Sequence, residues 1–267
     1  MRREKGEAGP VLSVPSQGQL RRWTSLTRKG MRRREGLTLA EGLKVVRELL
    51  VSPWHVEAIL VLKGREDLLE GLPGTGARAP LFRLTEGEWR RLTQDPTPEG
   101  IMAVAGRPRG EEGRRTTRDD RWVVLAPGIG NPSNLGALIR TMHWFGVTRL
   151  VLGKGSVDAA SPKVIRTSMG SVFHLLIEEG VDFQATLPRW RGERRLIAAV
   201  PRGGRAPHAV GEPAALLLGN ETWGLSDELL GHADELWTVP GEGGADSLSL
   251  PQAAAILLYE LWKGGRR

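Results

Sequence analysis

Cysteine is absent from the 267-residue sequence. Its absence excludes disulfides, thiolate metal sites and iron–sulfur clusters, together with every mechanism that needs a cysteine nucleophile. Histidine is scarce as well, and the five histidines show no ligand spacing with one another or with carboxylates. We therefore expect no metal site.

Long hydrophobic runs are also missing. No stretch approaches the roughly 18 uninterrupted apolar residues of a membrane span. The N-terminal residues MRREKGEAGP carry charges with no apolar segment behind them, so we expect no secretory signal either. These absences predict a cytoplasmic protein. Its length and its hydrophobic content of 40% suffice for one large domain or two ordinary ones.

Positive charge is concentrated at the N-terminus. The net charge is +7, and residues 1–35 hold ten Lys or Arg against three Glu, so the remainder sums to zero. Such a block is typical of a protein that binds a polyanion such as nucleic acid, although a solvated tail would look the same. We expect residues 1–15 to be disordered. The candidate nucleic-acid-binding residues, expected on exposed faces and a connecting loop, are Arg28, Lys29, Arg32, Arg33 and Arg34.

Residues 16–106 are predicted to form a small α/β domain. The pattern over 16–50 is helical, with Leu20, Trp23 and Leu26 on one helix face. A strand at 56–62, a short helix, a strand with a helix starting near Thr85, and a strand at 100–106 follow. Residues 107–120 contain no apolar side chain and are predicted to be a linker.

Residues 121–267 alternate strands with helices. Strands are predicted at 121–126, 149–153, 195–200 and 214–218, with a further strand ending at Pro240; helices are predicted over 134–146 and 161–175 and at the C-terminus. In the first helix Leu135, Leu138, Ile139 and Met142 form the buried stripe. This alternation favours a parallel sheet with helices on both faces.

Polar residues that a core does not need lie where these strands end. Asn220 and Glu221 follow the strand at 214–218, and Asn134 and Arg140 lie in the helix that follows the strand at 121–126. Ser247 and Ser249 precede the last helix. Open α/β sheets place their ligands at such positions. The structural alternatives are helix capping for Asn134 and Ser247, and an ion pair between Glu221 and Arg140.

Two glycine-containing segments do not match nucleotide-binding motifs. Gly128, Gly130 and Gly136 lack the spacing of a dinucleotide-binding loop, and no acidic residue ends the next strand. GKGS at 153–156 lacks the spacing of a phosphate-binding loop.

Three segments in order carry a family resemblance: NPSNLGALIRTMHWFG, LLLGNETWGLSDEL and VPGEGGADSLSLPQAAAILLYE. They resemble the signature motifs of the SpoU/TrmH family of RNA ribose 2′-O-methyltransferases, in the SPOUT superfamily, over about 121–264. The N-terminal part is similar to the substrate-binding domain that many members carry, with RRREGLTLAEG and TPEGIMAVA as its landmarks.

The resemblance implies a SPOUT-type parallel sheet with a C-terminal trefoil knot, preceded by the substrate-binding domain. It implies S-adenosylmethionine as cofactor and a homodimer in which the partner chain completes each active site. Cofactor contacts fall at Gly219, Val239 and Leu248, largely through the backbone, with Leu218 adjacent. Catalytic or RNA-positioning roles fall at Asn134, Arg140, Glu221, Ser247 and Ser249. Ser249 stands where the family usually has Asn, so it keeps a hydroxyl and loses the amide.

The implied reaction moves a methyl group to a ribose 2′-oxygen, without a metal. Arg140's counterpart is often proposed as the base in this family, but a guanidinium keeps its proton far above pH 7, which favours a fixed cation on the adjacent phosphate and developing alkoxide. The RNA is rRNA or tRNA, and the separate N-terminal domain favours rRNA by analogy. The alternative is a non-catalytic RNA-binding or ribosome-assembly factor that retains the fold, which the Ser249 replacement would favour.

Overall fold

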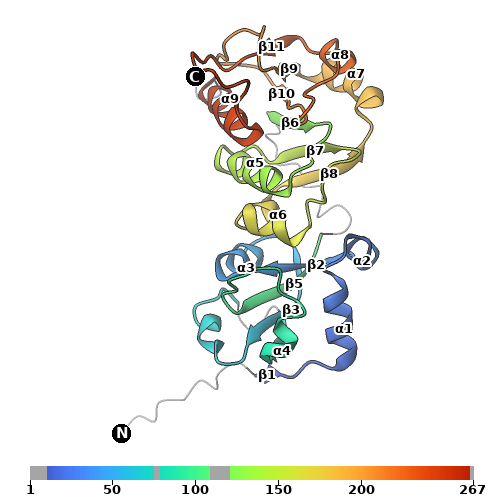
Figure 1. Ribbon diagram of the computed structural model, residues 1–267, viewed down its shortest axis with the longest axis vertical. Coiled ribbons are helices and arrows are strands. Elements are labelled where there is room, and N and C mark those ends of the chain that lie inside the picture. Colours follow the sequence, from blue (N-terminus) through green and yellow to red (C-terminus); the bar gives the residue numbers. More distant parts are fainter. Residues whose placement is uncertain (1–10, 75–78, 109–120, 265–267) are drawn as a thin grey trace. The chain divides into compact units, whose positions relative to one another are not determined.

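The computed structural model describes residues 11–74, 79–108 and 121–264. The chain divides into two compact units, Met1–Pro108 and Arg109–Arg267, drawn in Figure 1. Residues 1–10 of the segment expected to be disordered, and residues 109–120 of the expected linker, lie outside the described residues. For residues 11–15 the expected disorder is wrong, because Leu12–Ser13 form a strand that pairs with Leu81 and Phe82. None of the described helices is long and apolar enough to cross a membrane.

The first unit is built on a mixed five-stranded sheet in the order β1-β4-β3-β5-β2. The parallel strands are β1 (Leu12–Ser13), β4 (Leu81–Leu84) and β3 (His55–Leu62), and β5 (Ile101–Gly106) runs antiparallel to both β3 and β2 (Leu37–Glu41). The helical segments are α1 (Gln17–Ser25), α2 (Lys29–Glu35), α3 (Leu43–Leu50), η1 (Glu66–Leu69) and α4 (Glu86–Trp89).

Apolar residues of α1 pack on this sheet as their spacing predicts. Leu20, Trp23 and Leu26 are buried in one cluster with Phe82 and Trp89. The Trp23 and Phe82 rings meet edge to face with centroids 5.2 Å apart. The helix expected near Thr85 is confirmed, because the Thr85 hydroxyl accepts from the Glu88 amide in a capping box at the start of α4.

One expectation for this unit is wrong. The helical pattern expected over 16–50 includes residues 37–41, but these form the buried strand β2, which pairs with β5. Gly36 has φ 67° and Gly42 has φ 104°, so two glycines with positive φ bracket the strand. Leu, Ala and Glu are good helix formers, so only the pairing with β5 makes this segment a strand.

The second unit contains a six-stranded sheet in the order β11-β9-β10-β6-β7-β8, and every pairing in it is parallel, which confirms the expected sheet type. Its strands are β6 (Trp122–Ala126), β7 (Arg149–Gly153), β8 (Leu176–Val181), β9 (Arg195–Ala199), β10 (Ala214–Leu217) and β11 (Glu235–Trp237).

Helices cover both faces of this sheet. Figure 1 shows α5 (Pro132–Trp144) beside α9 (Leu250–Gly264) on one side, and α7 (Phe183–Glu193) with α8 (Asp227–Leu230) on the other. The predicted stripe of α5 is buried as expected: Leu135, Leu138, Ile139 and Met142 are inaccessible. Alternate strand residues such as Leu125 and Leu217 pack with α7 and α8.

The helix expected over 161–175 is broken. It consists of α6 (Pro162–Thr167) and a single turn, η3 (Ser171–His174), separated by Met169 at φ 53° and Gly170 at φ 82°. Two successive residues in the left-handed region end an α-helix. The strand expected to end at Pro240 stops at Trp237.

The order of the strands creates one switch point. From β6 the chain moves outward through β7 and β8, then returns to the other side of β6 with β9 and β10. β6 and β10 are therefore neighbours whose following loops run to opposite faces of the sheet. Ligands of open α/β sheets bind at the carboxyl ends of such strands.

Candidate active site

Glu221 lies at the carboxyl end of β10, in the turn that faces the start of α5. Its Oε2 accepts a hydrogen bond from the Gly130 amide at 3.1 Å, and its Oε1 accepts from the Asn131 amide at 3.3 Å and from Asn134 Nδ2 at 3.1 Å. One carboxylate thus joins the loop after β10 to the loop after β6. The amino terminus of a helix of 13 residues also favours a negative charge there.

These donors determine the charge of Glu221. Partial burial raises the pKa of its carboxyl, but hydrogen bonds from its own amide, from Gly130, from Asn134 and from Asn131 outweigh burial and hold the pKa below its ordinary value. Glu221 is therefore ionised at neutral pH and serves as an acceptor. It is not poised to take up a proton near pH 7.

Asn134 has a different role from the capping that its residue type suggested. The N-cap of α5 is Asn131, whose Oδ1 accepts from the Ser133 amide at 2.8 Å. Asn134, three residues later, points its amide nitrogen at Glu221. Its side chain is thereby fixed, and its carbonyl oxygen remains available to a ligand hydroxyl.

Asn220 organises the turn that carries Glu221. Its amide nitrogen Nδ2 donates to the Gly128 carbonyl at 3.1 Å, and its Oδ1 accepts from the Thr222 amide at 2.8 Å. Its backbone exchanges two 3.0 Å hydrogen bonds with Gly224. Gly219 permits this closure, because a Cβ there would lie 2.6 Å from the Gly224 backbone carbon. In a sequence, Asn followed by polar turn residues is typical of a turn held by the Asn side chain in this way.

The residues expected to hold a cofactor follow neighbouring parts of the sheet. Leu218 and Gly219 follow β10 and Val239 follows β11, with β9 between these two strands. Leu218 donates its amide to the Leu125 carbonyl at 2.8 Å. Within the described part of the chain, the N–H and C=O groups of Gly219, Val239 and Leu248 make no hydrogen bond. Free backbone groups at these partly exposed positions suit a nucleoside cofactor held through the main chain.

Ser247 and Ser249 lie apart from Glu221 in the bonding pattern. Ser247 is exposed, and no hydrogen bond from either serine reaches Glu221, Asn134 or Arg140 among the described residues. Ser249 directly precedes α9: its carbonyl accepts from the Ala253 amide at 3.0 Å, and its hydroxyl contacts Gln252 Oε1. Ser249, and not Ser247, is therefore engaged at the helix start.

Arg140 is separated from the Glu221 cluster. It lies six residues beyond Asn134 in α5, about 9 Å along the axis and about a third of a turn around it. Its side chain is exposed and has no partner within the described residues. The ion pair with Glu221 considered from the sequence is therefore not formed, because Glu221 is occupied by neutral donors on the first turn of the same helix.

Comparison with protein families divides the chain into two parts, as the two compact units of the structure do. The family described as SpoU rRNA Methylase matches residues 121–259, and a family described as MRM3-like substrate binding domain matches residues 18–103. The first match alone spans half of the sequence. The chain belongs to the SpoU rRNA methylase family.

Similar proteins cover nearly the whole chain of this SpoU family member. The 23S rRNA (guanosine(2553)-2′-O)-methyltransferase RlmP of Bacillus subtilis is 34% identical over 90% of this chain and 94% of its own. A TrmH-family protein from Porphyromonas gingivalis has a TM-score of 0.78 at 28% identity, covering 93% and 98% of the chains. The AdoMet-bound rRNA methyltransferase of Sinorhizobium meliloti has a TM-score of 0.76 at 25% identity, covering 94% and 96%.

The basic residues of the MRM3-like domain do not all face solvent. Arg28, Lys29, Arg33 and Arg34 are at least partly exposed. Arg32 is only 7% exposed, and its Nη1 donates to the Leu26 carbonyl at 3.0 Å and the Thr27 carbonyl at 2.9 Å. Its expected exposure is therefore wrong: α2 turns Arg32 back onto the end of α1, whose last carbonyls need donors.

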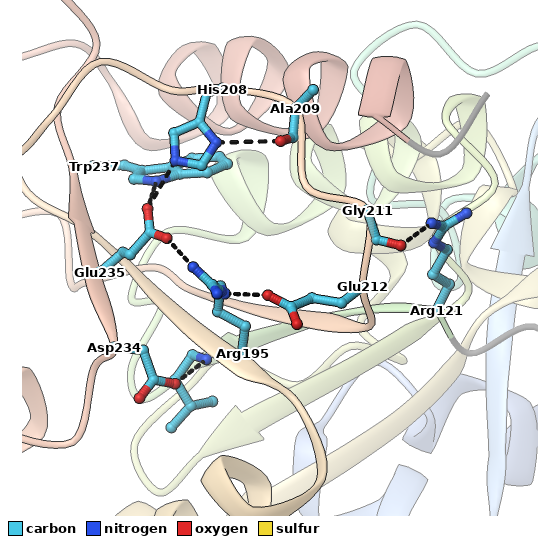
Figure 2. A network of polar contacts seen from close by, with 10 residues as sticks. Arg121, Arg195, His208, Ala209, Gly211, Glu212, Asp234, Glu235 and Trp237 are labelled. Carbon is cyan, nitrogen blue, oxygen red and sulfur yellow. Dashed lines mark hydrogen bonds and ion pairs between the residues drawn. The ribbon is translucent and has the colours of Figure 1, made fainter. Parts of the chain in front are cut away.

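Figure 2 shows a second polar network, which sequence reasoning missed. Glu235 begins β11 and is buried; its Oε2 accepts from Trp237 Nε1 at 2.9 Å and lies 2.9 Å from His208 Nε2. Its Oε1 pairs with Arg195, which begins β9 and also pairs with Glu212. The network lies at the amino ends of the strands, opposite the loop of Glu221. Arg195 and Glu235 are 40 residues apart, so no local pattern could have revealed their pairing.

Burial raises the pKa of the Glu235 carboxyl, but hydrogen bonds from Trp237, Arg195 and His208 outweigh it and place the pKa below its ordinary value.

The described residues contain no group of three or more His, Asp or Glu that could hold a metal ion.

Proposed function

We propose that this protein transfers a methyl group from S-adenosylmethionine to a ribose 2′-oxygen of ribosomal RNA. The observation that carries the proposal is the meeting of Glu221 and Asn134 at the switch point between β6 and β10, inside the SpoU match. The name of the B. subtilis relative supports rRNA over tRNA, and the AdoMet-bound S. meliloti neighbour supports the cofactor.

In this proposal the C-terminal segment forms the trefoil knot of the superfamily, and backbone groups of Gly219, Val239 and Leu248, beside Leu218, hold the cofactor. Their unbonded N–H and C=O groups within the described structure support this assignment. When bound, the cofactor supplies a methyl group on a positively charged sulfur. The chain's own contribution is then to align the acceptor oxygen and to stabilise the charge that develops on it.

Each polar residue has one assigned role. Asn134, held by Glu221, accepts from a ribose hydroxyl and orients the sugar. The Arg140 guanidinium grips the neighbouring phosphate and stabilises the developing alkoxide, while the 2′-proton leaves to phosphate or water. The exposed Ser247 hydroxyl contacts substrate or cofactor, and Ser249 fixes the start of α9.

An aromatic face on α5 and α9 supports the homodimer. The rings of Phe145, Tyr259 and Trp262 lie with centroids 6.1–6.2 Å apart, and we add to this face the exposed Trp144 and Ile256 of the same two helices. Trp144 is 83% exposed and Tyr259 45%, and exposed clusters of this kind are typical of subunit contacts. Arg140 lies one turn before Trp144 on the same side of α5, so it borders this face.

The reaction is tested with unmodified 23S rRNA transcribed in vitro and methyl-labelled S-adenosylmethionine, followed by mapping of ribose methylation. We expect label on one ribose 2′-oxygen, at a position that is unmethylated in rRNA from cells lacking the gene. Turnover should not change when EDTA is added. Label on a base, or chelator-dependent turnover, would contradict the proposed reaction.

The shared site is tested by combining two strongly impaired subunits, Arg140→Ala and Glu221→Gln. If Arg140 of one subunit serves Glu221 of the other, a mixed dimer contains one intact site and shows about half the wild-type turnover. If both residues serve the same subunit's site, the mixed dimer stays as impaired as its parents, and the shared-site assignment is wrong.

A further inference from the structure

Trp223 is a large aromatic side chain with no place in the fold. It is 77% exposed, in the turn between β10 and α8. Exposure of a single apolar residue is common, but an indole this exposed is unusual in a short turn that is otherwise polar. Its position points to a role at the candidate active site, because it lies two residues after Glu221, at the carboxyl end of β10.

The turn that carries Trp223 is fixed in place. Asn220 Oδ1 accepts from the Thr222 amide at 2.8 Å and from the Trp223 amide at 3.4 Å, and Gly224 closes the turn with two 3.0 Å backbone bonds to Asn220. Glu221 anchors the same turn to the start of α5. The indole therefore projects from a rigid base, so a ligand that covers it does not have to order the loop.

The charges around Trp223 limit what it can bind. Residues 219–231 contain no Lys, Arg or His, whereas Glu221, Asp227 and Glu228 are acidic. This turn is therefore unsuited to gripping a phosphate backbone. The Trp223 indole is the group on this turn that can hold RNA, because every nucleobase offers a flat face for stacking.

We propose that Trp223 is a stacking platform for a nucleobase of the RNA, next to the ribose that is methylated. The inference rests on the proposed function, since it places the base beside the Asn134–Glu221 site. Trp223 is thus a substrate-positioning residue that lowers the KM for RNA and discriminates against nucleotides that cannot be unstacked.

A second copy of the chain is the competing occupant, but Trp223 is not part of the aromatic face proposed as the subunit contact. Glu221 contacts the residues that lead into α5, whereas the exposed Trp144 of the aromatic face ends that helix, about 20 Å away along its axis. Trp223 therefore does not belong to the aromatic face that supports the dimer.

The test compares Trp223→Leu, Trp223→Phe and the neighbouring control Thr222→Ala in the full-length protein. With 23S rRNA transcript as substrate, we expect Trp223→Leu to raise KM about 5- to 140-fold, the range for loss of one base–aromatic stack, with kcat within a few-fold. Trp223→Phe keeps an aromatic face and should stay near wild type, as should Thr222→Ala. Affinity for S-adenosylmethionine and the size of the dimer should not change in any variant.

The readouts separate the alternatives. A wild-type KM for Trp223→Leu overturns this inference while leaving the proposed function intact. Loss of cofactor affinity would place Trp223 in the cofactor site, and dissociation of the dimer would place it at the subunit contact; either result overturns the stacking role. Failure of the wild-type protein to methylate rRNA removes the proposed function, and this inference with it.

Discussion

Two glutamates lie at opposite ends of the six-stranded sheet, and they differ in their exposure and in the groups that bind them. Glu221, at the carboxyl ends, is exposed and accepts from neutral donors: two backbone amides and Asn134. Glu235, at the amino ends, is buried and is bound by Arg195, His208 and Trp237. Both carboxyls have a lowered pKa, so the direction of the shift does not distinguish a site from a structural network.

The difference lies in what remains unsatisfied around each carboxylate. The Glu235 network is closed by a cation, an indole and a second carboxylate. Around Glu221, the side-chain carbonyl of Asn134 and the backbone of Gly219 have no partner in the described part of the chain, and the same is true of the Arg140 guanidinium further along α5. Groups left open at strand ends are available to a ligand, whereas closed networks contribute to stability. Changes at one end should therefore affect activity, and changes at the other should affect folding.

The largest effect is expected at Arg140. Arg140→Ala should lower turnover about a hundredfold or more, the scale for removing one preorganised charge-stabilising donor, and Arg140→Lys should keep part of the activity. Cofactor affinity and thermal stability should stay at wild-type values, since the side chain is exposed and unpartnered in the described structure. A folded, cofactor-binding Arg140→Ala with wild-type turnover would remove Arg140 from the mechanism.

Glu221→Gln should lower kcat by about 10- to 100-fold, because the amide cannot accept from all three donors and Asn134 loses its fixed position. The melting temperature should change little, since the side chain is exposed. Steady-state kinetics and a thermal melt on the same sample give both values. A large drop in melting temperature with unchanged kcat would make Glu221 a structural residue like Glu235.

Glu235→Gln should show the reverse pattern. We expect a decrease of about 1–3 kcal/mol in the free energy of unfolding, because Arg195 is left without one of its charged partners, with kcat unchanged. Urea unfolding measures the decrease. Equal activity losses in Glu235→Gln and Glu221→Gln would contradict the division between the two ends of the sheet.

The same pair tests the pH dependence. The folded-state pKa of Glu235 is lowered, so its ionised form stabilises the fold above the unfolded-state pKa of about 4.5, and this contribution disappears as the pH falls through the folded value. The stability gap between wild type and Glu235→Gln should therefore be nearly full at pH 5 and shrink below about pH 4.5. A gap that is constant down to about pH 3 would contradict the assignment.

In the MRM3-like domain, adjacent arginines offer a similar contrast. Arg33→Ala combined with Arg34→Ala should weaken RNA binding and reduce the log–log salt slope by about 0.7–0.9 for each phosphate that is no longer bound. Arg32→Ala should instead lower the melting temperature, because two carbonyls at the end of α1 are left without their donor. Filter binding at several salt concentrations measures the slope. An unchanged slope in the double variant would mean that the exposed arginines face only solvent.

The smallest effect is expected at Ser249. Its hydroxyl contacts Gln252 at the start of α9, and asparagine is an equally good residue before a helix. Ser249→Asn should therefore leave turnover within a few-fold of wild type, as measured under the conditions used for Arg140. A large decrease would show that the pocket depends on serine.

Much of the second unit was predictable from the chain alone. Apolar runs at 121–126, 149–153, 195–200 and 214–218 predicted parallel strands, and the spacing in α5 predicted its buried stripe. These elements were predictable because the spacing of apolar residues within a segment reflects which of its residues are buried. The polar residues after the strands then predicted that Glu221 and Asn134 lie at one edge of a sheet, where they do form a hydrogen bond.

Other features depend on residues far apart in the chain, and no local pattern contains them. Residues 37–41 are a strand because β5, about 60 residues later, pairs with them. Arg32 is buried because α2 folds back on the carbonyls that end α1. Glu221 binds Asn134 and not Arg140 because β10 lies beside β6, which brings it to the first turn of α5, while a helix rise of about 1.5 Å per residue carries Arg140 away.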